Sequence, residues 1–300
     1  SPSRGLGDVY KRQTDLQQAL DNGGEVTLGD NITGSVTVPS GKTVTLNLNG
    51  HTLTADQKYA AITNNGTLTI AGPGTVDGSN LSQTAAIYNA PSGVANLNGG
   101  TFTGSKWYVI KNLGTMTIDG ASVAQDDAGS SAIDNGYFGN AGNDCGVSEP
   151  SSATVSLTII NGSFSGGMNV VKNDDFGVLS ITGGTFTNTD GPAVLNWNKA
   201  TIDGGDFSVN NSASGVIANG SYGANSPDKG ELIINAGTFT APNNGSGNIF
   251  AQGQGGTSGG TAVVSGGSYN GSLDNLSNLN VDVEVSGGSF TDAAVAKYVK

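Results

Sequence analysis

The sequence predicts an all-β solenoid of stacked parallel strands, and three observations point to this fold class. A hydrophobic–x–Gly–Gly–x–aromatic pattern recurs with a base period of 21–22 residues, for example at 181–186, 202–207 and 285–290. A second pattern, Ala or Val followed by a hydrophobic residue, any residue and Asn, lies between its copies. No segment between the patterns keeps a helical period over ten or more residues. Strands this short gain stability when each coil covers the edge of its neighbour.

Seven successive copies of the second pattern place an asparagine two residues after an apolar side chain. Because residues i and i+2 of a strand share a face, each asparagine is expected to point inward. A buried amide is costly unless it is hydrogen-bonded, and identical amides one strand spacing apart can donate and accept along a row. We therefore predict an asparagine ladder made of Asn64, Asn89, Asn112, Asn135, Asn173, Asn196 and Asn219.

The aromatic residue that ends the first pattern is expected to stack on its equivalent in the next coil, at about 4.8 Å. The asparagine row, the Gly-Gly corner and the 21–22-residue period together resemble the right-handed parallel β-helix of pectate-lyase-like proteins. The resemblance covers residues 25–292 and implies about ten or eleven coils. Residues 41–53, GKTVTLNLNGHTL, are similar to the first coil of bacterial cell-surface β-helix proteins.

The ends of the chain differ from the repeats. Residues 1–13, SPSRGLGDVYKRQ, contain both arginines and resemble a translated sequencing adapter from metagenomic assembly, so we expect a non-native leader there. Residues 14–24 predict a capping helix, with a capping box from Thr14 to Gln17 and a stop at Gly23-Gly24. The β-helix is expected over residues 25–292. Residues 293–300 are expected to cover the last coil, through Val295 and Tyr298, or to begin a missing segment.

Composition excludes several functional classes. A net charge of −12 and a pI near 4.2 argue against a nucleic-acid binder, which needs clustered cations. His51 and Cys145 are the only histidine and cysteine, so neither a zinc site of the usual kind nor an intramolecular disulfide is expected. No apolar run approaches the roughly 20 residues that a membrane span requires. The 49 glycines are interpreted largely as corners of the solenoid.

Length variation between coils is confined to one corner, directly after the ladder asparagine. The insertions at 136–152 and 220–230 are expected to form two walls of a cleft, three coils or roughly 14 Å apart. Aromatic rings beside carboxylates suit a sugar ring, although solvated turns with ordinary surface aromatics are the alternative. The predicted ligand-binding residues are Asp174, Asp175, Phe176, Trp197 and Lys199 on the floor, and Tyr137, Phe138 and Tyr222 on the walls.

The resemblance to pectate-lyase-like proteins implies that catalysis must be considered, because families of this fold cleave pectin and related polymers. Elimination needs an arginine or lysine base beside calcium-bound carboxylates, but residues 14–300 contain no arginine and only single lysines. A carboxylate-only glycosidase stays open, with Asp174 or Asp175 as acid and Asp134 as base. No cofactor is expected. Calcium on the Asp126-Asp127 or Asp174-Asp175 pair is the alternative.

Two further rows are predicted to point outward, away from the core. Lys111, Asp134 and Lys172 share one ladder position in successive coils, which predicts cross-strand pairing worth a few tenths of a kcal/mol per pair. Threonine and serine flank the stacked aromatics and resemble the flat face of ice-binding solenoids, although Asp77, Ala124, Asp206 and Asn270 interrupt these rows. Threonine's preference for strands explains most of this pattern.

The sequence therefore favours a non-catalytic binding or adhesion module, secreted or at the bacterial cell surface. Its expected partner is a polysaccharide or a host or cell-surface glycan, with no nucleic acid and no membrane span. A polysaccharide lyase or glycoside hydrolase acting in a carboxylate-lined cleft is the alternative. An ice-binding surface is the third hypothesis.

Overall fold

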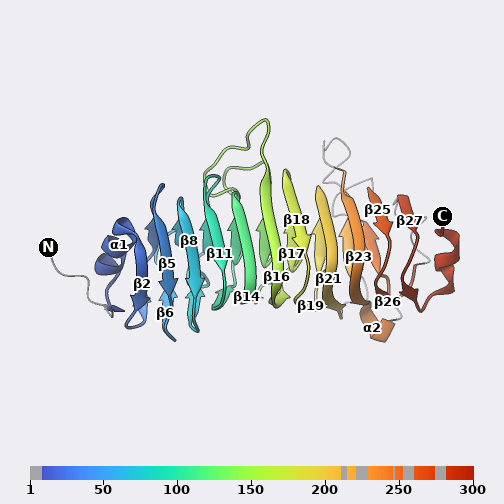
Figure 1. The fold of residues 1–300 in the computed structure, drawn as a ribbon, viewed down its shortest axis with the longest axis horizontal. Coiled ribbons are helices and arrows are strands. Elements are labelled where there is room, and N and C mark those ends of the chain that lie inside the picture. Colours follow the sequence, from blue (N-terminus) through green and yellow to red (C-terminus); the bar gives the residue numbers. More distant parts are fainter. Residues whose placement is uncertain (1–8, 211–214, 221–228, 246, 253–259, 274–281) are drawn as a thin grey trace.

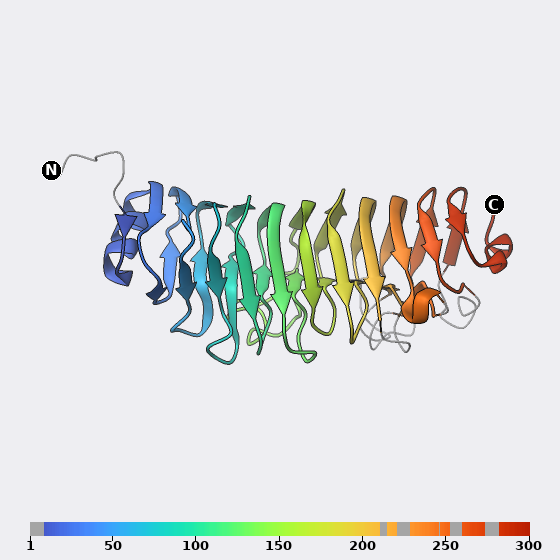
Figure 2. The ribbon, with the colours of Figure 1, turned by 90° about the horizontal axis from the view of Figure 1, so that it is seen from below.

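The computed structural model describes residues 9–210, 215–220, 229–245, 247–252, 260–273 and 282–300. The chain forms a parallel β-helix, an elongated solenoid with helix α1 (Gln13–Asn22) at one end and the 3-10 helix η2 (Ala293–Lys297) at the other (Figure 1). Strands of successive coils lie side by side along the long axis, as Figure 2 shows. The predicted fold class is confirmed.

One sheet, called here the ladder sheet, contains the asparagine pattern. Within the described residues, nine parallel strands stack in chain order as β4 (Val36–Val38), β7 (Tyr59–Asn64), β10 (Thr84–Asn89), β13 (Ile110–Asn112), β15 (Ile133–Asn135), β17 (Val171–Asn173), β20 (Val194–Asn196), β22 (Ile217–Asn219) and β24 (Phe250–Gln252). All seven predicted asparagines are fully buried. Nδ2 of each of the first six donates to Oδ1 of the next asparagine at 2.7–2.9 Å, which confirms the predicted ladder.

The other nineteen strands that the structure describes form two parallel runs. The first face contains β1 (Val9–Tyr10), β2 (Gly24–Leu28), β5 (Thr43–Asn47), β8 (Thr67–Ala71), β11 (Val94–Leu97), β18 (Gly177–Ile181), β25 (Thr261–Val264) and β27 (Asp282–Val285). The aromatic face contains β3 (Ile32–Thr33), β6 (Thr52–Thr54), β9 (Thr75–Asp77), β12 (Thr101–Gly104), β19 (Thr185–Asn188), β26 (Ser268–Asn270) and β28 (Ser289–Phe290). Both faces share the long strands β14 (Thr115–Gln125), β16 (Val155–Gly166), β21 (Lys199–Val209) and β23 (Glu231–Thr240).

In the described part of the chain the aromatic face has eleven strand segments, seven of its own and four from the shared strands, in agreement with the predicted ten or eleven coils. Its inward rings form a continuous stack from Phe164 to Phe290, with centroids 4.5–4.9 Å apart. The Gly-Gly corner makes room for the stack. At Gly184, where φ is +101°, a Cβ would lie 3.1 Å from the Phe164 ring. Glycine therefore satisfies both the left-handed backbone and the close approach of the ring.

Helix α1 covers the first coil with its apolar side, and Leu16, Ala19 and Leu20 are buried as expected. The predicted capping box is wrong, because the helix begins at Gln13. Gln17 instead exchanges two hydrogen bonds of 2.8 Å with the backbone of Thr37 in β4. Its amide therefore satisfies the open edge of the ladder sheet.

Part of the predicted leader belongs to the fold. Val9 and Tyr10 form β1, which pairs in parallel with Thr27 and Leu28 of β2. Residues 1–8 lie outside the described residues. The segment that the structure describes thus adds a short strand to the first coil.

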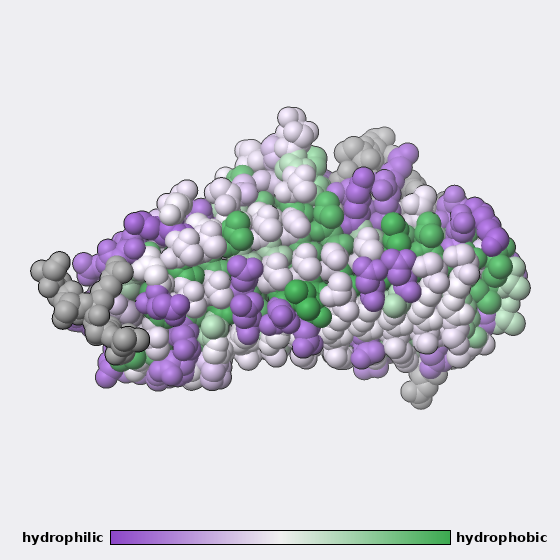
Figure 3. Space-filling model, in the orientation of Figure 1, coloured by the Kyte–Doolittle hydropathy of each residue, from purple (hydrophilic) through white to green (hydrophobic). Residues whose placement is uncertain are grey.

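At the other end, Val295 and Tyr298 pack against the core and η2 lies over the last coil. A single-turn helix, α2 (Pro242–Gly245), lies outside the sheets. In the described part of the chain, no helix has the length and apolarity needed to cross a membrane. The large hydrophobic side chains exposed on the first face, such as Val178 and Ile233, are few, and the hydrophobic surface in Figure 3 is broken into small patches.

Candidate functional site

The outward side of the ladder sheet carries a row of charged residues. Lys111, Asp134 and Lys172 stand opposite one another in β13, β15 and β17, so the predicted outward direction and pairing are confirmed. Their side chains are nevertheless buried, at only 0, 0 and 6% exposed. The 136–152 insertion brings the fully buried Asp144 to the row, with aromatic side chains packed around it. The row is therefore a buried charge cluster.

Lys111 fixes the insertion to the sheet. Its ammonium group donates to Asp134 Oδ2 at 2.5 Å, to Asp144 Oδ1 at 2.8 Å and to the carbonyl of Gly136 at 2.9 Å, which uses all three of its N–H groups. Asp144 also accepts from the backbone N–H of Phe138 at 2.9 Å. Burial alone would lower the pKa of Lys111, but Asp134 and Asp144 more than offset this and raise the pKa above its usual range. The ammonium form is therefore retained.

Lys172 has a different environment. Its Nζ donates to Asp174 Oδ2 at 2.5 Å and lies 3.7 Å from Asp134 Oδ1. The same atom lies 4.3 Å from the ring centroid of Phe138 and 4.5 Å from that of Trp197. Cations at such distances from aromatic rings are stabilised by the ring quadrupole. Lys172 thus joins the insertion, through Phe138, to the following coils.

Asp174 and Asp134 are the buried carboxylates that face Lys172. Asp174 is 1% exposed, and burial raises the pKa of its carboxyl to about 7, although Lys172 opposes the shift. Asp134 is fully buried. Neither carboxylate lines the cavity described below. The prediction that Asp174 would form the floor of an open cleft is therefore wrong, because the insertion and the aromatic rings cover it.

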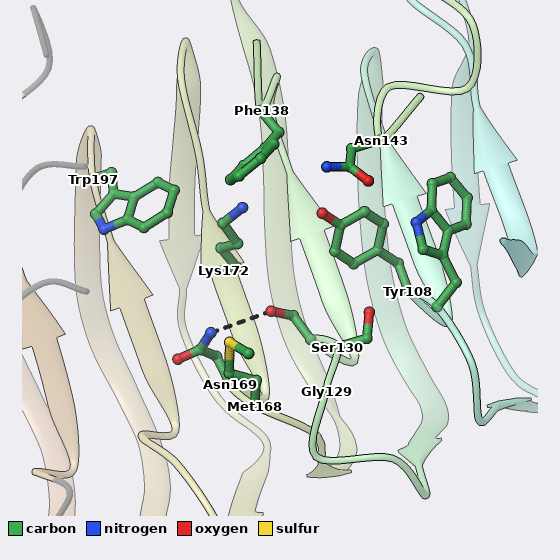
Figure 4. Close-up of a pocket in the computed structure, with 11 residues that line it drawn as sticks. Tyr108, Gly129, Ser130, Phe138, Asn143, Met168, Asn169, Lys172 and Trp197 are labelled. Carbon is green, nitrogen blue, oxygen red and sulfur yellow. Dashed lines mark hydrogen bonds between the residues drawn. The ribbon is translucent and has the colours of Figure 1, made fainter. Parts of the chain in front are cut away.

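A cavity of about 510 Å³ lies over the charged row (Figure 4). Tyr108 lies on one side of it, and Phe138 and Trp197 on the other, with Lys172 beside them. The chain supplies these residues from successive coils: Tyr108 precedes β13, Lys172 is in β17 and Trp197 follows β20. The remaining lining consists of Trp107, Gly129, Ser130, Ser131, Asn143, Met168 and Asn169.

The cavity is rich in hydrogen-bonding groups that carry no charge. Asn169 Nδ2 donates to Ser131 Oγ at 3.2 Å, the contact drawn in Figure 4. The indole N–H of Trp107 is buried without a hydrogen-bond partner among the described residues. Burial and the nearby Asp134 raise the pKa of the Tyr108 hydroxyl, so it stays protonated. Flat rings next to uncharged polar groups suit a ligand with both apolar faces and oxygen atoms.

The structure brings only part of the predicted site together. Phe138 and Trp197 line the cavity, with ring centroids 6.4 Å apart. Tyr137 is buried and meets Phe176 edge-on at 6.1 Å, away from the lining. Asp175 pairs with the backbone of Tyr137.

Lys199 was predicted on the floor, and this is wrong. It opens β21 on the first face, where its side chain is 60% exposed and its Nζ lies 3.5 Å from Glu231 Oε2. The Asn-Trp-Asn-Lys connection is so short that the chain has already turned the corner at Lys199.

Of the second predicted wall, residues 220–230, the structure describes only residue 220 and residues 229–230. Gly136 and Gly220 both follow a ladder asparagine, and their N–H groups donate to Asn112 and Asn196, each at 3.0 Å. The two insertions therefore leave the solenoid at the same corner. Tyr222 lies outside the described residues.

Residues on the other side of the cavity were missed by sequence reasoning. Trp107, Tyr108, Ser130 and Asn169 all lie just before a strand of the ladder sheet, whereas the predicted site contains only residues that follow such a strand. The sequence signal for this side of the cavity was the Trp-Tyr dipeptide immediately before Val109, which places two aromatic rings at the start of a ladder strand. In a stack of short strands, both ends of each strand open onto the same outer surface.

No protein-family model, curated protein or solved structure matches this chain. Function must therefore be argued from the geometry of the site. Within the described ranges, no group of three or more His, Cys, Asp or Glu side chains is placed to hold a metal ion. The ammonium groups of Lys111 and Lys172 lie between the carboxylates of the cluster.

The threonine and serine rows form a second surface, on the outer side of the aromatic face. Thr101, Ser122, Ser163, Thr185, Asp206 and Thr238 stand in register in successive strands, as predicted. The parallel row contains the predicted interruptions Asp77 and Ala124. Thr103 Oγ1 donates to Asp77 Oδ1 at 2.8 Å, so part of this row is already hydrogen-bonded within the protein.

Proposed function

We propose that this chain is a non-catalytic carbohydrate-binding module and that the sugar binds in the cavity over the ladder sheet. The observation that carries the proposal is the lining: Tyr108 faces Phe138 and Trp197 across a space bordered by amides, hydroxyls and the Lys172 ammonium group. Sugar rings combine apolar C–H faces with hydroxyl edges, so they suit aromatic surfaces next to amides and hydroxyls. A volume of about 510 Å³ is in the range of small-ligand sites.

The length of the cavity favours a short oligosaccharide. Tyr108 belongs to the coil of β13 and Trp197 to the coil of β20, with β15 and β17 between them. Three strand spacings correspond to roughly 14 Å. This distance exceeds the length of one sugar ring, so the two aromatic sides would contact different sugars of one chain.

The proposed location is outside the cell or at the bacterial cell surface, where polysaccharides and host glycans are the available partners. Its support is the similarity of residues 41–53 to the first coil of bacterial surface β-helix proteins. The acidic composition, with a net charge of −12, is also compatible with a soluble extracellular module.

Glycan-array screening followed by calorimetric titration of the full chain tests the proposal. Tyr108→Ala and Phe138→Ala are each expected to weaken binding of the best glycan about tenfold or more, because each removes one stacking surface. Tyr298→Ala, at the far end of the solenoid, and Lys199→Ala, on the first face, are the matched controls. The proposal is wrong if no glycan binds, or if the cavity variants and controls bind alike while circular dichroism shows intact folds.

Carbohydrate cleavage is a second candidate function, favoured by the raised pKa of Asp174, which suits a general acid. Against it, neither Asp174 nor Asp134 lines the cavity. Release of reducing ends from a bound polysaccharide, lost in Asp174→Asn and in Asp175→Asn, would support catalysis. Binding without release supports the module.

Ice binding by the outer side of the aromatic face is a third candidate, favoured by the register of its threonine and serine rows. Thermal hysteresis of the purified chain, abolished by Thr185→Tyr with Thr238→Tyr, would support it. A chain that shows no hysteresis has no ice-binding function.

A further inference from the structure

Lys172 is the charged residue in the lining of the cavity, among the residues that the structure describes. Its ammonium group carries three N–H groups, and Asp174 Oδ2 accepts one of them at 2.5 Å. Asp134 Oδ1 lies 3.7 Å away, beyond hydrogen-bond distance. In the described part of the chain, Lys172 Nζ donates no other hydrogen bond. Two of its N–H groups are therefore available to a ligand.

The ammonium group of Lys172 lies between the two aromatic sides of the cavity (Figure 4). Its Nζ is 4.3 Å from the ring centroid of Phe138, 4.5 Å from that of Trp197 and 6.0 Å from that of Tyr108. A carboxylate of the ligand placed here would accept charge-assisted hydrogen bonds, which are roughly twice as strong as those between neutral groups. The apolar face of the same sugar ring could then contact the aromatic side chains.

The buried cluster behind Lys172 determines how an additional negative charge is tolerated. Lys111 and Lys172 face the carboxyl groups of Asp134, Asp144 and Asp174, so the cluster has a formal charge of −1 when all three are ionised. Burial raises the pKa of Asp174 to about 7, and Asp134 raises it further, whereas Lys172 and Lys111 lower it. One proton on Asp174 makes the cluster neutral.

A ligand carboxylate at Lys172 and a proton on Asp174 favour each other. The two carboxyl groups would share one ammonium group, and the like charges of their ionised forms would raise the pKa of Asp174 above its value in the free chain. By thermodynamic linkage, protonation of Asp174 strengthens binding of the carboxylate by the same factor. The Tyr108 hydroxyl, which also faces Asp174, stays protonated because burial raises its pKa.

The charge of the whole chain favours a ligand with a single acidic group. The lining supplies one ammonium group among the described residues, whereas the chain has a net charge of −12. At physiological ionic strength, charges more than about 8 Å apart are largely screened, so one carboxylate in contact with Lys172 is little affected by the distant acidic residues. Further carboxylates along the same ligand would find no second cation in the described lining.

We propose that the cavity binds a short oligosaccharide in which one sugar carries a carboxylate, that Lys172 donates to this carboxylate, and that binding is coupled to the uptake of a proton by Asp174. This inference rests on the proposed carbohydrate-binding function. It adds the group that distinguishes the preferred ligand from neutral and polyanionic glycans, and a dependence of affinity on pH.

Calorimetric titration of the full chain with three β-1,4-linked trimers tests the inference. The first contains three glucose residues, the second has one glucuronic acid in place of a glucose, and the third contains three glucuronic acids. At pH 5.5, we expect the mono-acid trimer to bind about tenfold more tightly than either of the others. At pH 8 its affinity should fall about tenfold, because Asp174 is then about one pH unit above its pKa and must take up a proton.

Proton uptake can be measured directly on the unaltered chain. Titration at pH 7.5 in two buffers of different ionisation enthalpy gives the number of protons that accompany binding. We expect at least about half a proton per mono-acid trimer and none for the glucose trimer. This measurement does not depend on whether a variant folds.

Three variants assign the effects to residues. Asp174→Asn holds no titratable proton, so it is expected to bind the mono-acid trimer equally well at pH 5.5 and pH 8. Lys172→Met removes the ammonium group and should lose the preference for the mono-acid trimer over the glucose trimer. Lys199→Met, at a lysine that is 60% exposed on the first face, is the matched control and should keep both the preference and its pH dependence. Circular dichroism checks that each variant is folded.

The outcomes separate this inference from the function on which it rests. Equal affinities for the glucose and mono-acid trimers at pH 5.5, or tightest binding of the trimer with three acids, would overturn the inference and leave carbohydrate binding in place. A mono-acid preference without proton uptake would overturn the coupling to Asp174. Absence of binding to any glycan on an array would overturn the proposed function and this inference together.

Discussion

Replacement of Asn112 by alanine interrupts the asparagine ladder near its centre. The Asn112 side chain accepts from Asn89 at 2.8 Å and donates to Asn135 at 2.7 Å and to the carbonyl of Ser156 at 3.0 Å. It also accepts from the backbone N–H of Gly114 at 3.2 Å. Since Asn112 is fully buried, water cannot replace these bonds in the folded state.

The expected loss of stability in Asn112→Ala depends on which neighbouring groups keep a hydrogen-bond partner. Asn89 Nδ2 keeps hydrogen bonds to Gly93 and Thr115, both at 3.1 Å, so it is only partly affected. Asn135 Oδ1 loses a donor in a buried environment, and the part-buried Ser156 carbonyl loses one as well. A hydrogen bond contributes about 1 kcal/mol net and a buried group left without a partner costs about 1–3 kcal/mol. The expected loss in the free energy of unfolding is therefore about 3–5 kcal/mol.

Urea unfolding followed by tryptophan fluorescence measures this loss locally. The only two tryptophans, Trp107 and Trp197, both pack over the ladder sheet. The matched control is Asn161→Ala, because Asn161 is exposed and, among the described residues, its side chain accepts only from Gly162 at 2.9 Å. We expect the control to change stability by less than about 1 kcal/mol. Equal unfolding midpoints for the two variants would refute the view that the ladder stabilises the solenoid.

Three other predictions follow from the charge cluster and the corners. Lys111→Met leaves two buried carboxylates without their lysine partner and should lower the free energy of unfolding by about 3–5 kcal/mol in the same urea titration. A decrease below about 1 kcal/mol would contradict the anchoring role of Lys111. Because folding raises the pKa of Asp174 to about 7, the folded state keeps a proton that the unfolded chain releases. This contribution to stability is fully present below about pH 4 and is lost as the pH rises to about 7, so the urea midpoint of the wild-type chain should fall over that range. In Asp174→Asn the midpoint should depend less on pH. An equal pH dependence in the variant and the wild type would contradict the raised pKa of Asp174. Gly166 and Gly41 have similar φ angles, +81° and +76°, but a Cβ at Gly166 would lie 2.0 Å from the Gln125 carbonyl oxygen, whereas the space at Gly41 is open. Gly166→Ala should therefore lower the melting temperature more than Gly41→Ala. Equal melting temperatures of the two variants would exclude a steric contribution.

The repeating part of the fold could be predicted from the sequence because each repeat contains the same information. Asn89 and Asn112 occupy equivalent positions in neighbouring coils, and so do Phe186 and Phe207. Inward direction follows from strand alternation, and stacking follows from the short period. These inferences need no knowledge of the loops.

The candidate site could be predicted only in part, because it depends on how an insertion folds back. Lys111, Asp134 and Lys172 point away from the core as expected, yet the insertion that carries Asp144 buries them. The two-residue alternation along a strand predicts which way a side chain points, but it does not predict which segment covers that side chain. The burial of Asp174 has the same origin.

The register of the ladder is independent of the length of the connections between its members. The chain needs 23 residues from Asn112 to Asn135 and 38 from Asn135 to Asn173, and the two hydrogen bonds measure 2.7 and 2.8 Å. Fifteen additional residues are thus accommodated at one corner without displacing a strand. In evolutionary terms, the segment that walls the cavity can be lengthened, shortened or exchanged by recombination while the inherited scaffold continues to fold. Selection for a new ligand could therefore act on one insertion alone, and grafting such an insertion into another coil is a practical route to engineered receptors.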